Sequence, residues 1–372
     1  MKLDIIEPTL QDYTGHCHAY MTSLLNAQNE TFPNLKLKLW IGRRSKYKQL
    51  FQIESVVPFF YYKIRKIQLF FLYRSLIKNH NHIFVPTAGM IDLVILHKLL
   101  KNSNFLGSVH LHFHQFNLTH KKQRRLQFLS NNDGIFHIMT PTDRLTNIFL
   151  DHGFTKVSTV PCPLYSPPKN INSSNTPQKN SLRKVLYTGA ARADKGFINV
   201  VKFIQQSLLK IHFHIQAPKP HNGKYNKKIL PAINLLEQLN NTRKNLTVSY
   251  KSASPQEYQS LFINSITLLI YNVEDYKDKF SGILLESLYM GAPVIVTEGT
   301  WFSQVIHKYK AGIIVKPGNM NEITQAISNI NENYDEYTKK ATYAGKELFQ
   351  KHQPKNTLQA ILNHCESIHP YQ

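Results

Sequence analysis

The chain has 372 residues, of which 42% are hydrophobic and 11% aromatic. Because a single hydrophobic core rarely extends beyond about 250–300 residues, this length and composition predict two domains. Lys and Arg number 45 against 23 Asp and Glu, which gives a formal net charge of +22. So large a positive charge indicates an anionic partner, for which a diphosphate, an anionic lipid and a nucleic acid are the candidates.

Cysteine usage and the first residues bear on the compartment. Cys17, Cys162 and Cys365 are few, odd in number and widely spaced, which favours neither a disulfide framework nor a zinc cluster. A reducing cytoplasm is therefore expected. Charged residues at positions 2, 4 and 7 interrupt any apolar leader, and apolar runs stay short of a membrane span. We expect neither a signal peptide nor an integral membrane protein.

The N-terminal segment reads as strand, loop and helix. Residues 3–6 are predicted to form a strand and residues 19–25 a helix, with Tyr13, Thr14, Gly15 and His16 between them. A glycine in such a loop allows close approach of a ligand, but a plain turn explains the same residues.

Residues 59–78 combine aromatic and aliphatic side chains with cations such as Lys63, Lys66 and Arg74. This mixture suits an interfacial helix on anionic lipid, where each cation near the surface contributes about 1 kcal/mol. A buried helix whose charged ends reach solvent explains the segment equally well.

A strand with three histidines follows at residues 108–116, SVHLHFHQF. Strict alternation places His110, His112 and His114 on one face of the strand. Side chains two residues apart on a strand lie roughly 7 Å apart, which suits two metal ligands at best. Since no neighbouring Cys, Asp or Glu completes a set, no metal site is predicted. It is equally possible that the three histidines are ordinary residues of a core or surface strand without a functional role.

Strand-like and helix-like segments alternate in both halves of the chain, which predicts parallel sheets wrapped by helices. The segments in the first half are strands at 83–86, 108–114, 135–139 and 157–160 and helices at 90–100 and 143–152. The strands of the second half are 184–188, 211–216, 246–250, 267–271, 294–296 and 312–315.

Residues 166–182 are rich in Pro, Asn and Ser and lack apolar periodicity, so they are predicted to link two domains. The predicted organisation is an N-terminal domain at 1–165, a C-terminal domain at 183–350, and a C-terminal helix at 351–372 that can return to the N-terminal domain.

The loop after the strand at 184–188 carries glycines and cations. Gly189 and Gly196 allow close backbone approach, Arg192 can grip a diphosphate with two hydrogen bonds, and Lys195 adds a point charge. Strand, small-residue loop, basic pair and helix together favour phosphate binding. A solvated turn is the alternative. Further on, Ser254 and Glu257 predict a capped helix start.

The most informative stretch is residues 278–297, DKFSGILLESLYMGAPVIVT. It predicts an apolar helix that Gly291 ends and Pro293 keeps from continuing, followed by a buried strand. A helix apolar on nearly every side is expected inside a domain, so Glu286 in its middle should be buried and need a partner. Two hydroxyl groups of a ligand could be that partner, because they can donate hydrogen bonds to the carboxylate.

The start of this helix is suited to an anion. Ser281 and Gly282 follow Phe280 and carry little bulk, so backbone N–H groups and the positive end of the helix dipole are available. Asp278 precedes Glu286 by eight positions in the same stretch.

These residues resemble the retaining GT-B glycosyltransferases, in particular glycosyltransferase family 4, also called glycosyl transferases group 1. The family carries an acidic residue, seven others and Glu, then a Gly-x-Pro-Val-Ile run, which corresponds here to Asp278, Glu286 and residues 291–295. The first acid is usually Glu, and Ser281 stands where Gly is commoner.

The upstream loop resembles the same family's Gly-Arg-x-x-x-x-Lys-Gly pattern. Gly189, Lys195 and Gly196 match its spacing. The arginine differs, because Ala190 occupies its usual place and Arg192 lies two residues later.

The resemblance implies an α/β fold of the GT-B type, with two Rossmann-like domains facing each other across a cleft. It implies that Glu286 holds the ribose of a nucleotide donor, that Asp278 lies beside the donor sugar, and that Phe280 belongs to the donor site. Arg192, Lys195 and the helix start at Ser281 and Gly282 would stabilise the departing diphosphate.

In the N-terminal domain, the resemblance implies a histidine that faces the donor sugar. His114 is the best match and His112 the second. The loop at Gly15 would close over the donor phosphate.

The implied activity is transfer of a hexose-type sugar from a nucleoside-diphosphate sugar to a glycan or polyprenyl-linked acceptor, in bacterial surface-polysaccharide synthesis. We expect no metal or other cofactor, since no Asp-x-Asp pair is present to hold a metal on the diphosphate. A cytoplasmic enzyme, peripheral on the inner face of the cell membrane, would fit the charge.

Two other functions remain open. A different GT-B enzyme, such as a sugar-nucleotide epimerase, would share the donor motifs. A nucleic-acid-binding protein would share the basic charge, but no recognition helix, zinc finger or stacking platform is found, so nucleic acid is not the predicted partner.

Overall fold

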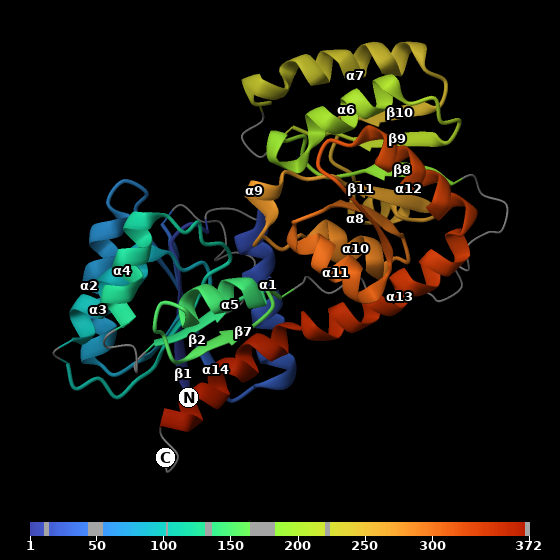
Figure 1. Cartoon of the computed structure of the whole chain (residues 1–372). Helices are drawn as coiled ribbons and strands as arrows, with labels where there is room; N and C mark the ends of the chain where they lie inside the picture. Colours follow the sequence, from blue (N-terminus) through green and yellow to red (C-terminus); the bar gives the residue numbers. More distant parts are fainter. Residues whose placement is uncertain are drawn as a thin grey trace. The chain divides into compact units, whose positions relative to one another are not determined.

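The computed structural model describes residues 1–10, 15–43, 55–101, 103–130, 136–163, 183–219 and 224–368. The chain forms two compact units, one of Met1–Pro167 with Lys351–Gln372 and one of Pro168–Gln350 (Figure 1). The predicted linker at 166–182 lies outside the described residues.

The first unit is built on a seven-stranded sheet in the order β3-β2-β1-β4-β5-β6-β7, in which all pairs are parallel. Its strands are β1 (Lys2–Glu7), β2 (Lys36–Gly42), β3 (Val56–Phe60), β4 (His82–Val85), β5 (Val109–His112), β6 (Phe136–Thr140) and β7 (Val157–Thr159). The order reverses beside β1, as in a doubly wound Rossmann-like sheet.

Helices cover both faces of this sheet. They are α1 (Gly15–Thr31), α2 (Arg65–Lys78), α3 (Met90–Leu100), α4 (His120–Ser130), α5 (Asp143–Leu150) and α14 (Pro354–Ile368). Buried residues of α2, α3, α4 and α5 share one hydrophobic cluster, while those of α1 and α14 share another. The C-terminal helix α14 packs against α1 in this unit.

Strand β5 shows how the sequence pattern places its side chains. Val109 and Leu111 enter the cluster formed with α2 to α5, whereas His110 and His112 are fully buried and lie outside it. Successive side chains of a strand point to opposite faces. The prediction that these two histidines share a face is therefore confirmed.

The second unit has a six-stranded parallel sheet in the order β10-β9-β8-β11-β12-β13. Its strands are β8 (Lys184–Tyr187), β9 (His212–Gln216), β10 (Leu246–Ser249), β11 (Ser265–Leu269), β12 (Val294–Thr297) and β13 (Gly312–Val315). The strand order reverses between β8 and β11, and ligands of open α/β sheets bind beyond the carboxyl ends of the strands at such a reversal.

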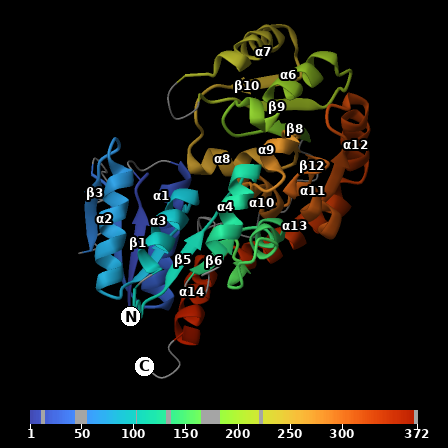
Figure 2. The same cartoon turned by 60° about the vertical axis from the view of Figure 1, so that its left-hand side comes forward.

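The helices of this unit also lie on both faces of its sheet, with α6 and α7 on one side and α10 and α11 on the other (Figures 1 and 2). They are η3 (Ala193–Lys195), α6 (Phe197–Gln206), η4 (Lys227–Ile229), α7 (Leu230–Thr242), α8 (Pro255–Leu261), α9 (Val273–Tyr276), α10 (Gly282–Tyr289), α11 (Trp301–Tyr309), α12 (Met320–Glu332) and α13 (Tyr334–Lys351).

The predicted alternation of strands and helices in parallel sheets is confirmed in both units. The predicted cap of α8 is also present, because Ser254 Oγ accepts from the Glu257 N–H at 3.3 Å and Glu257 Oε2 accepts from the Ser254 N–H at 2.7 Å.

One prediction for the first unit was wrong. The interval 59–78 is not one helix, because residues 59 and 60 end β3 and α2 begins at Arg65. β-branched and aromatic residues at 56–60 favour a strand, and pairing with β2 extends the sheet. Within the described residues, each helix is too short or too polar to cross a membrane.

Candidate active site

The loop after β8 is shaped by two glycines with positive φ. Gly196, at φ 68°, would place a Cβ atom 2.0 Å from the carbonyl oxygen of Ile270 at the end of β11. Gly189, at φ 99°, would place one 2.7 Å from Cδ1 of Ile283 in α10. Glycine therefore lets this loop pack directly against the next strand and against α10.

Lys195 lies at the end of this loop and points toward Gly189. A Cβ atom on Gly189 would be 3.2 Å from Nζ of Lys195. The pKa of Lys195 is lowered to about 8, first by burial and then by nearby Arg192, while Asp194 and Glu286 oppose the shift. At pH 7 the group is mostly an ammonium ion with incomplete hydration, which an anionic ligand would stabilise.

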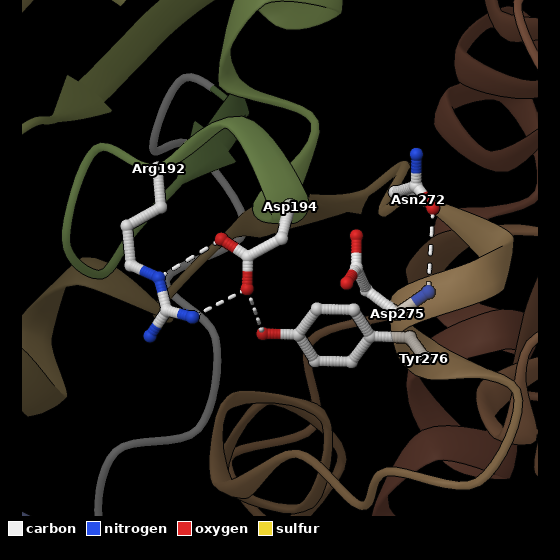
Figure 3. Close-up of polar contacts among 5 residues, drawn as sticks. All are labelled: Arg192, Asp194, Asn272, Asp275 and Tyr276. Atoms are coloured by element: carbon white, nitrogen blue, oxygen red, sulfur yellow. Dashed lines mark hydrogen bonds and ion pairs between the residues drawn. The ribbon is translucent and has the colours of Figure 1, made fainter. Parts of the chain in front are cut away.

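Arg192 is paired with Asp194 (Figure 3). Its Nε donates to Oδ1 of Asp194 at 2.9 Å, and its Nη2 contacts Oδ2. Tyr276 of α9 donates to the same carboxylate at 3.5 Å. The sequence pattern did not reveal this pair, and a diphosphate would have to compete with Asp194 for the guanidinium group.

The prediction that Glu286 is buried was wrong, because the residue is exposed. Ile283, Leu284 and Leu285 face the core, which leaves Glu286 on the exposed side of α10. Gly282, one turn earlier, lies on that same side, and a Cβ atom there would be 4.0 Å from Oε1 of Glu286.

The Glu286 carboxylate has a partner that the sequence did not indicate. Tyr258 of α8 donates a hydrogen bond from its hydroxyl to Oε2 of Glu286 at 2.7 Å. Protein atoms surround the carboxylate on most sides, and this loss of hydration raises its pKa, whereas Tyr258 and Lys195 act in the opposite direction. One carboxylate oxygen thus has a fixed donor, and Oε1 faces the helix start.

The start of α10 is extended and lacks a side-chain cap. Ser281 is the N-cap residue, with φ −132° and ψ 121°, and its side chain makes no capping hydrogen bond. The first N–H groups of a helix have no partner within it. Asp278 is buried in the loop just before, and the ring of Phe280 packs edge-on against Trp301 with centroids 6.3 Å apart.

The structure thus brings Gly189, Lys195, Gly282 and Glu286 together at the carboxyl edge of the second sheet, where the strand order reverses between β8 and β11. The group combines a carboxylate, a half-buried ammonium and an uncapped helix start. Such a group can bind paired hydroxyls and a phosphate at neighbouring points.

Two of the predicted residues of the first unit, His112 and His114, contact Tyr20 of α1. Nδ1 of His112 lies 2.5 Å from the Tyr20 hydroxyl, and the His114 ring stacks on Tyr20 with centroids 5.2 Å apart. Gly15 is the first residue of α1. Tyr13 and Thr14 lie outside the described residues.

Comparisons with known proteins bear on both units. The model of the family described as glycosyl transferases group 1 matches residues 169–348. That segment contains Gly189, Lys195, Asp278 and Glu286. No curated protein sequence matches the chain.

Solved structures resemble the chain over its whole length. A glycosyltransferase from Rickettsia africae has a TM-score of 0.73 at 12% identity, covering 99% of this chain and 98% of the other. The lipopolysaccharide outer core galactosyltransferase WaaB has a TM-score of 0.71 at 13% identity, covering 98% and 100%. Anabaena Alr3699/HepE, solved with UDP, has a TM-score of 0.69 at 12% identity, covering 100% of both chains.

At these identities the structural likeness shows the fold, and the family model shows the class of enzyme. Residues 169–348 match the model of the glycosyl transferases group 1 family, and the chain is a glycosyltransferase with the α/β GT-B fold of two Rossmann-like domains.

Proposed function

We propose that the chain transfers a hexose-type sugar from a nucleoside-diphosphate sugar to a glycan or polyprenyl-linked acceptor, with retention of the anomeric configuration. The observation that carries the proposal is the convergence of Lys195, Glu286 and the uncapped start of α10. Similar structures support the class of donor, since Anabaena Alr3699/HepE was solved with UDP-glucose and an Escherichia coli protein of TM-score 0.68 with UDP-2-fluoro glucose.

The nucleotide half of the donor fits the second unit. The Tyr258 hydroxyl fixes one oxygen of Glu286, and Glu286 lies on the exposed side of α10, so its carboxylate can accept hydrogen bonds from the two ribose hydroxyls. The diphosphate would lie against the N–H groups of α10 beyond Ser281 and against the Lys195 ammonium.

The proposed chemistry is a front-face substitution. The bond from the anomeric carbon to the diphosphate oxygen breaks, the acceptor oxygen bonds to the same face, and the acceptor proton passes to the departing phosphate. Lys195 and the start of α10 stabilise the charge that develops on the diphosphate, so a side-chain base is not needed. Because these groups supply positive charge, the proposal includes no metal on the diphosphate and no cofactor.

Orientation of the sugar is assigned to Asp278 in the second unit and to His114 in the first. For Asp278, burial beside the start of α10 supports the assignment. For His114, His112 and Gly15, contact with the donor stays a prediction from the family resemblance. A role in bacterial surface-polysaccharide synthesis rests on the same analogy.

Thermal melting with a panel of nucleotide sugars tests the donor assignment, because a ligand that binds only the folded state raises Tm. The nucleotide sugar with the largest shift is then incubated with candidate acceptors, and the product is examined by NMR. We expect a new conjugate with the donor's anomeric configuration. A free sugar nucleotide with one inverted centre would instead establish an epimerase, and an inverted linkage would exclude retention.

The same enzyme is proposed to work on the inner face of the cell membrane, through α2. Leu69, Leu72 and Leu76 are buried on one side of the helix, whereas Ile67 and Phe71 are each 61% exposed on the other. Lys63, Lys66 and Arg74 are exposed around this apolar pair. Exposed apolar residues ringed by cations suit the headgroup region of an anionic bilayer, where a polyprenyl-linked acceptor would be found.

A further inference from the structure

The folded chain places two further histidines beside His110, the first histidine of the strand with three histidines. His110 of β5 lies beside His137 of β6 and His364 of α14, with one ligand atom from each within 4.8 Å of the others. Residues 137 and 364 are distant from 110 in the chain, so the absence of a nearby Cys, Asp or Glu in the sequence did not exclude a metal site. The parallel pairing of β5 with β6 and the packing of α14 assemble the cluster.

His110 and His137 face each other across a short gap. Their Nδ1 atoms are 3.1 Å apart. Two imidazole nitrogens bound to one tetrahedral zinc ion are about 3.3–3.4 Å apart, since each Zn–N bond is about 2.0–2.1 Å. The pair is therefore already spaced as two ligands of one ion.

The other ring nitrogen of each histidine is held by a serine. Nε2 of His110 is 2.8 Å from Oγ of Ser108, and Nε2 of His137 is 2.7 Å from Oγ of Ser158. Metal-binding histidines usually donate their second N–H to a hydrogen-bond acceptor, a part that a serine oxygen can take here, and this bond fixes the tautomer and turns the other nitrogen toward the metal. Ser108 Oγ can pass its own hydrogen on to Nδ1 of His82, 2.8 Å away.

This arrangement has a consequence for the facing nitrogens. When each Nε2 donates to its serine, both Nδ1 atoms direct lone pairs at each other, and the lone pairs repel unless a cation accepts them. Without a metal, one histidine must take the other tautomer and form an N–H···N bond, with its serine as donor. The arrangement with two facing lone pairs favours a bound cation, whereas the arrangement with an N–H···N bond does not. Measuring the affinity of the protein for a metal ion therefore distinguishes them.

Lys156 also lies close to His137 and His364, and its positive charge opposes a bound cation.

We propose that His110, His137 and His364 bind one zinc ion in the first unit. Its fourth ligand would be water, because Sγ of Cys365 lies on the other side of the His110 ring, 3.5 Å from Nε2. The His364 ring stacks on His137 with centroids 4.5 Å apart and planes at 12°. Binding requires it to rotate out of this stack so that a nitrogen points at the ion.

The site would act as a structural clamp for the C-terminal segment. β5 and β6 supply two ligands, and α14 supplies the third. Residues 351–372 belong to this unit although the whole second unit precedes them in the chain. A metal bound to the folded state alone would fix α14 on the sheet and raise the stability of the first unit.

A competition titration tests the proposal with zinc itself. The full chain is stripped with EDTA, exchanged into metal-free buffer and titrated with Zn²⁺ against a chromophoric chelator, and the bound metal is counted by mass spectrometry. We expect one zinc per chain and an increase in Tm. The variant His364→Phe keeps a ring on His137 but lacks the ligand, and should bind at least about 100-fold more weakly, whereas the exposed control His307→Phe should bind as the wild type does.

A milder variant covers the case in which His364→Phe fails to fold. Ser158→Ala removes the partner of His137 Nε2 and should weaken zinc binding roughly tenfold. The spectrum with Co²⁺ should lack a thiolate charge-transfer band, which separates this site from the second cluster of His112, His114 and Cys162. Absence of stoichiometric zinc, unchanged affinity in His364→Phe, or loss of binding in Cys162→Ser would each overturn the proposal.

Discussion

The hydroxyl of Tyr258 donates a 2.7 Å hydrogen bond to the carboxylate of Glu286 and so fixes one oxygen of an acidic side chain that is open to solvent. The two residues are 28 positions apart and come from different helices, α8 and α10. A carboxylate held in this way is prepared to accept hydrogen bonds from a ligand without reorganisation.

Replacing Glu286 should remove donor binding. Glu286→Ala should lower kcat/KM at least about 100-fold, because two charge-assisted hydrogen bonds to ribose are each worth about 1.5–3 kcal/mol. Tyr258→Phe should cost about tenfold, since the carboxylate stays but loses its fixed donor. Steady-state kinetics and donor titration measure both. Glu274→Ala is the control, with a side chain 81% exposed on α9, and should leave kcat/KM unchanged. Wild-type donor affinity in Glu286→Ala would refute the assigned role.

Lys195 should control the alkaline limb of the pH profile. Burial lowers its pKa to about 8, so the ammonium that binds the diphosphate is present below that pH and lost above it. A plot of kcat/KM should therefore be level below about pH 8 and fall at higher pH. Lys195→Arg keeps its positive charge at high pH, so its kcat/KM should not decrease above pH 8. Lys195→Ala should lower kcat about 100-fold or more. An identical alkaline limb in Lys195→Arg would assign the titration to another group.

Arg192 should contribute less than Lys195, because Asp194 already occupies its guanidinium group. Arg192→Ala is expected to slow turnover about tenfold with little change in KM, since its contact would strengthen only as the diphosphate departs. Rapid-mixing kinetics with saturating donor measure the effect. Unchanged turnover would leave the diphosphate contact to Lys195 and the start of α10.

Gly196 should be far more sensitive to substitution than another glycine with the same backbone conformation. Gly196→Ala would place Cβ 2.0 Å from the Ile270 carbonyl oxygen, whereas Gly318, at φ 72°, has open space around the same position. Gly318→Ala should cost only the left-handed backbone penalty of about 1–2 kcal/mol, and Gly196→Ala at least about 3 kcal/mol. Urea unfolding of the two variants side by side gives the comparison. Equal losses would mean that the loop can move away from β11.

The α2 surface should bind anionic lipid. The chain is expected to sediment with vesicles that contain phosphatidylglycerol and to stay in solution with phosphatidylcholine alone, because the +22 net charge supplies attraction only to the former. Phe71→Glu should weaken sedimentation at least about tenfold. The matched control is Tyr343→Glu on α13, since Tyr343 and Phe71 are both 61% exposed. Equal loss in the two variants would exclude α2 as the binding surface.

Short sequence patterns were sufficient to predict those elements whose formation depends on neighbouring residues alone. Alternating apolar segments predict buried strands and their covering helices, and Gly291 and Pro293 predict the end of α10, which stops at Tyr289. The wrong boundary at residues 59–65 arose because aromatic and aliphatic residues fit a strand or an apolar helix equally well. Pairing with β2 decided between them.

Turn chemistry and hydrophobic period act over a few residues, so they were enough to predict two parallel α/β units, the loop from Gly189 to Gly196 and the motif that ends at Glu286. Only the folded chain shows that Glu286 is exposed and bonded to Tyr258, that Arg192 is paired with Asp194, and that His110 lies beside His137 and His364. These contacts depend on which strands become neighbours and how helices rotate on a sheet. Burial of the whole core fixes both, and no short segment of the sequence carries that information.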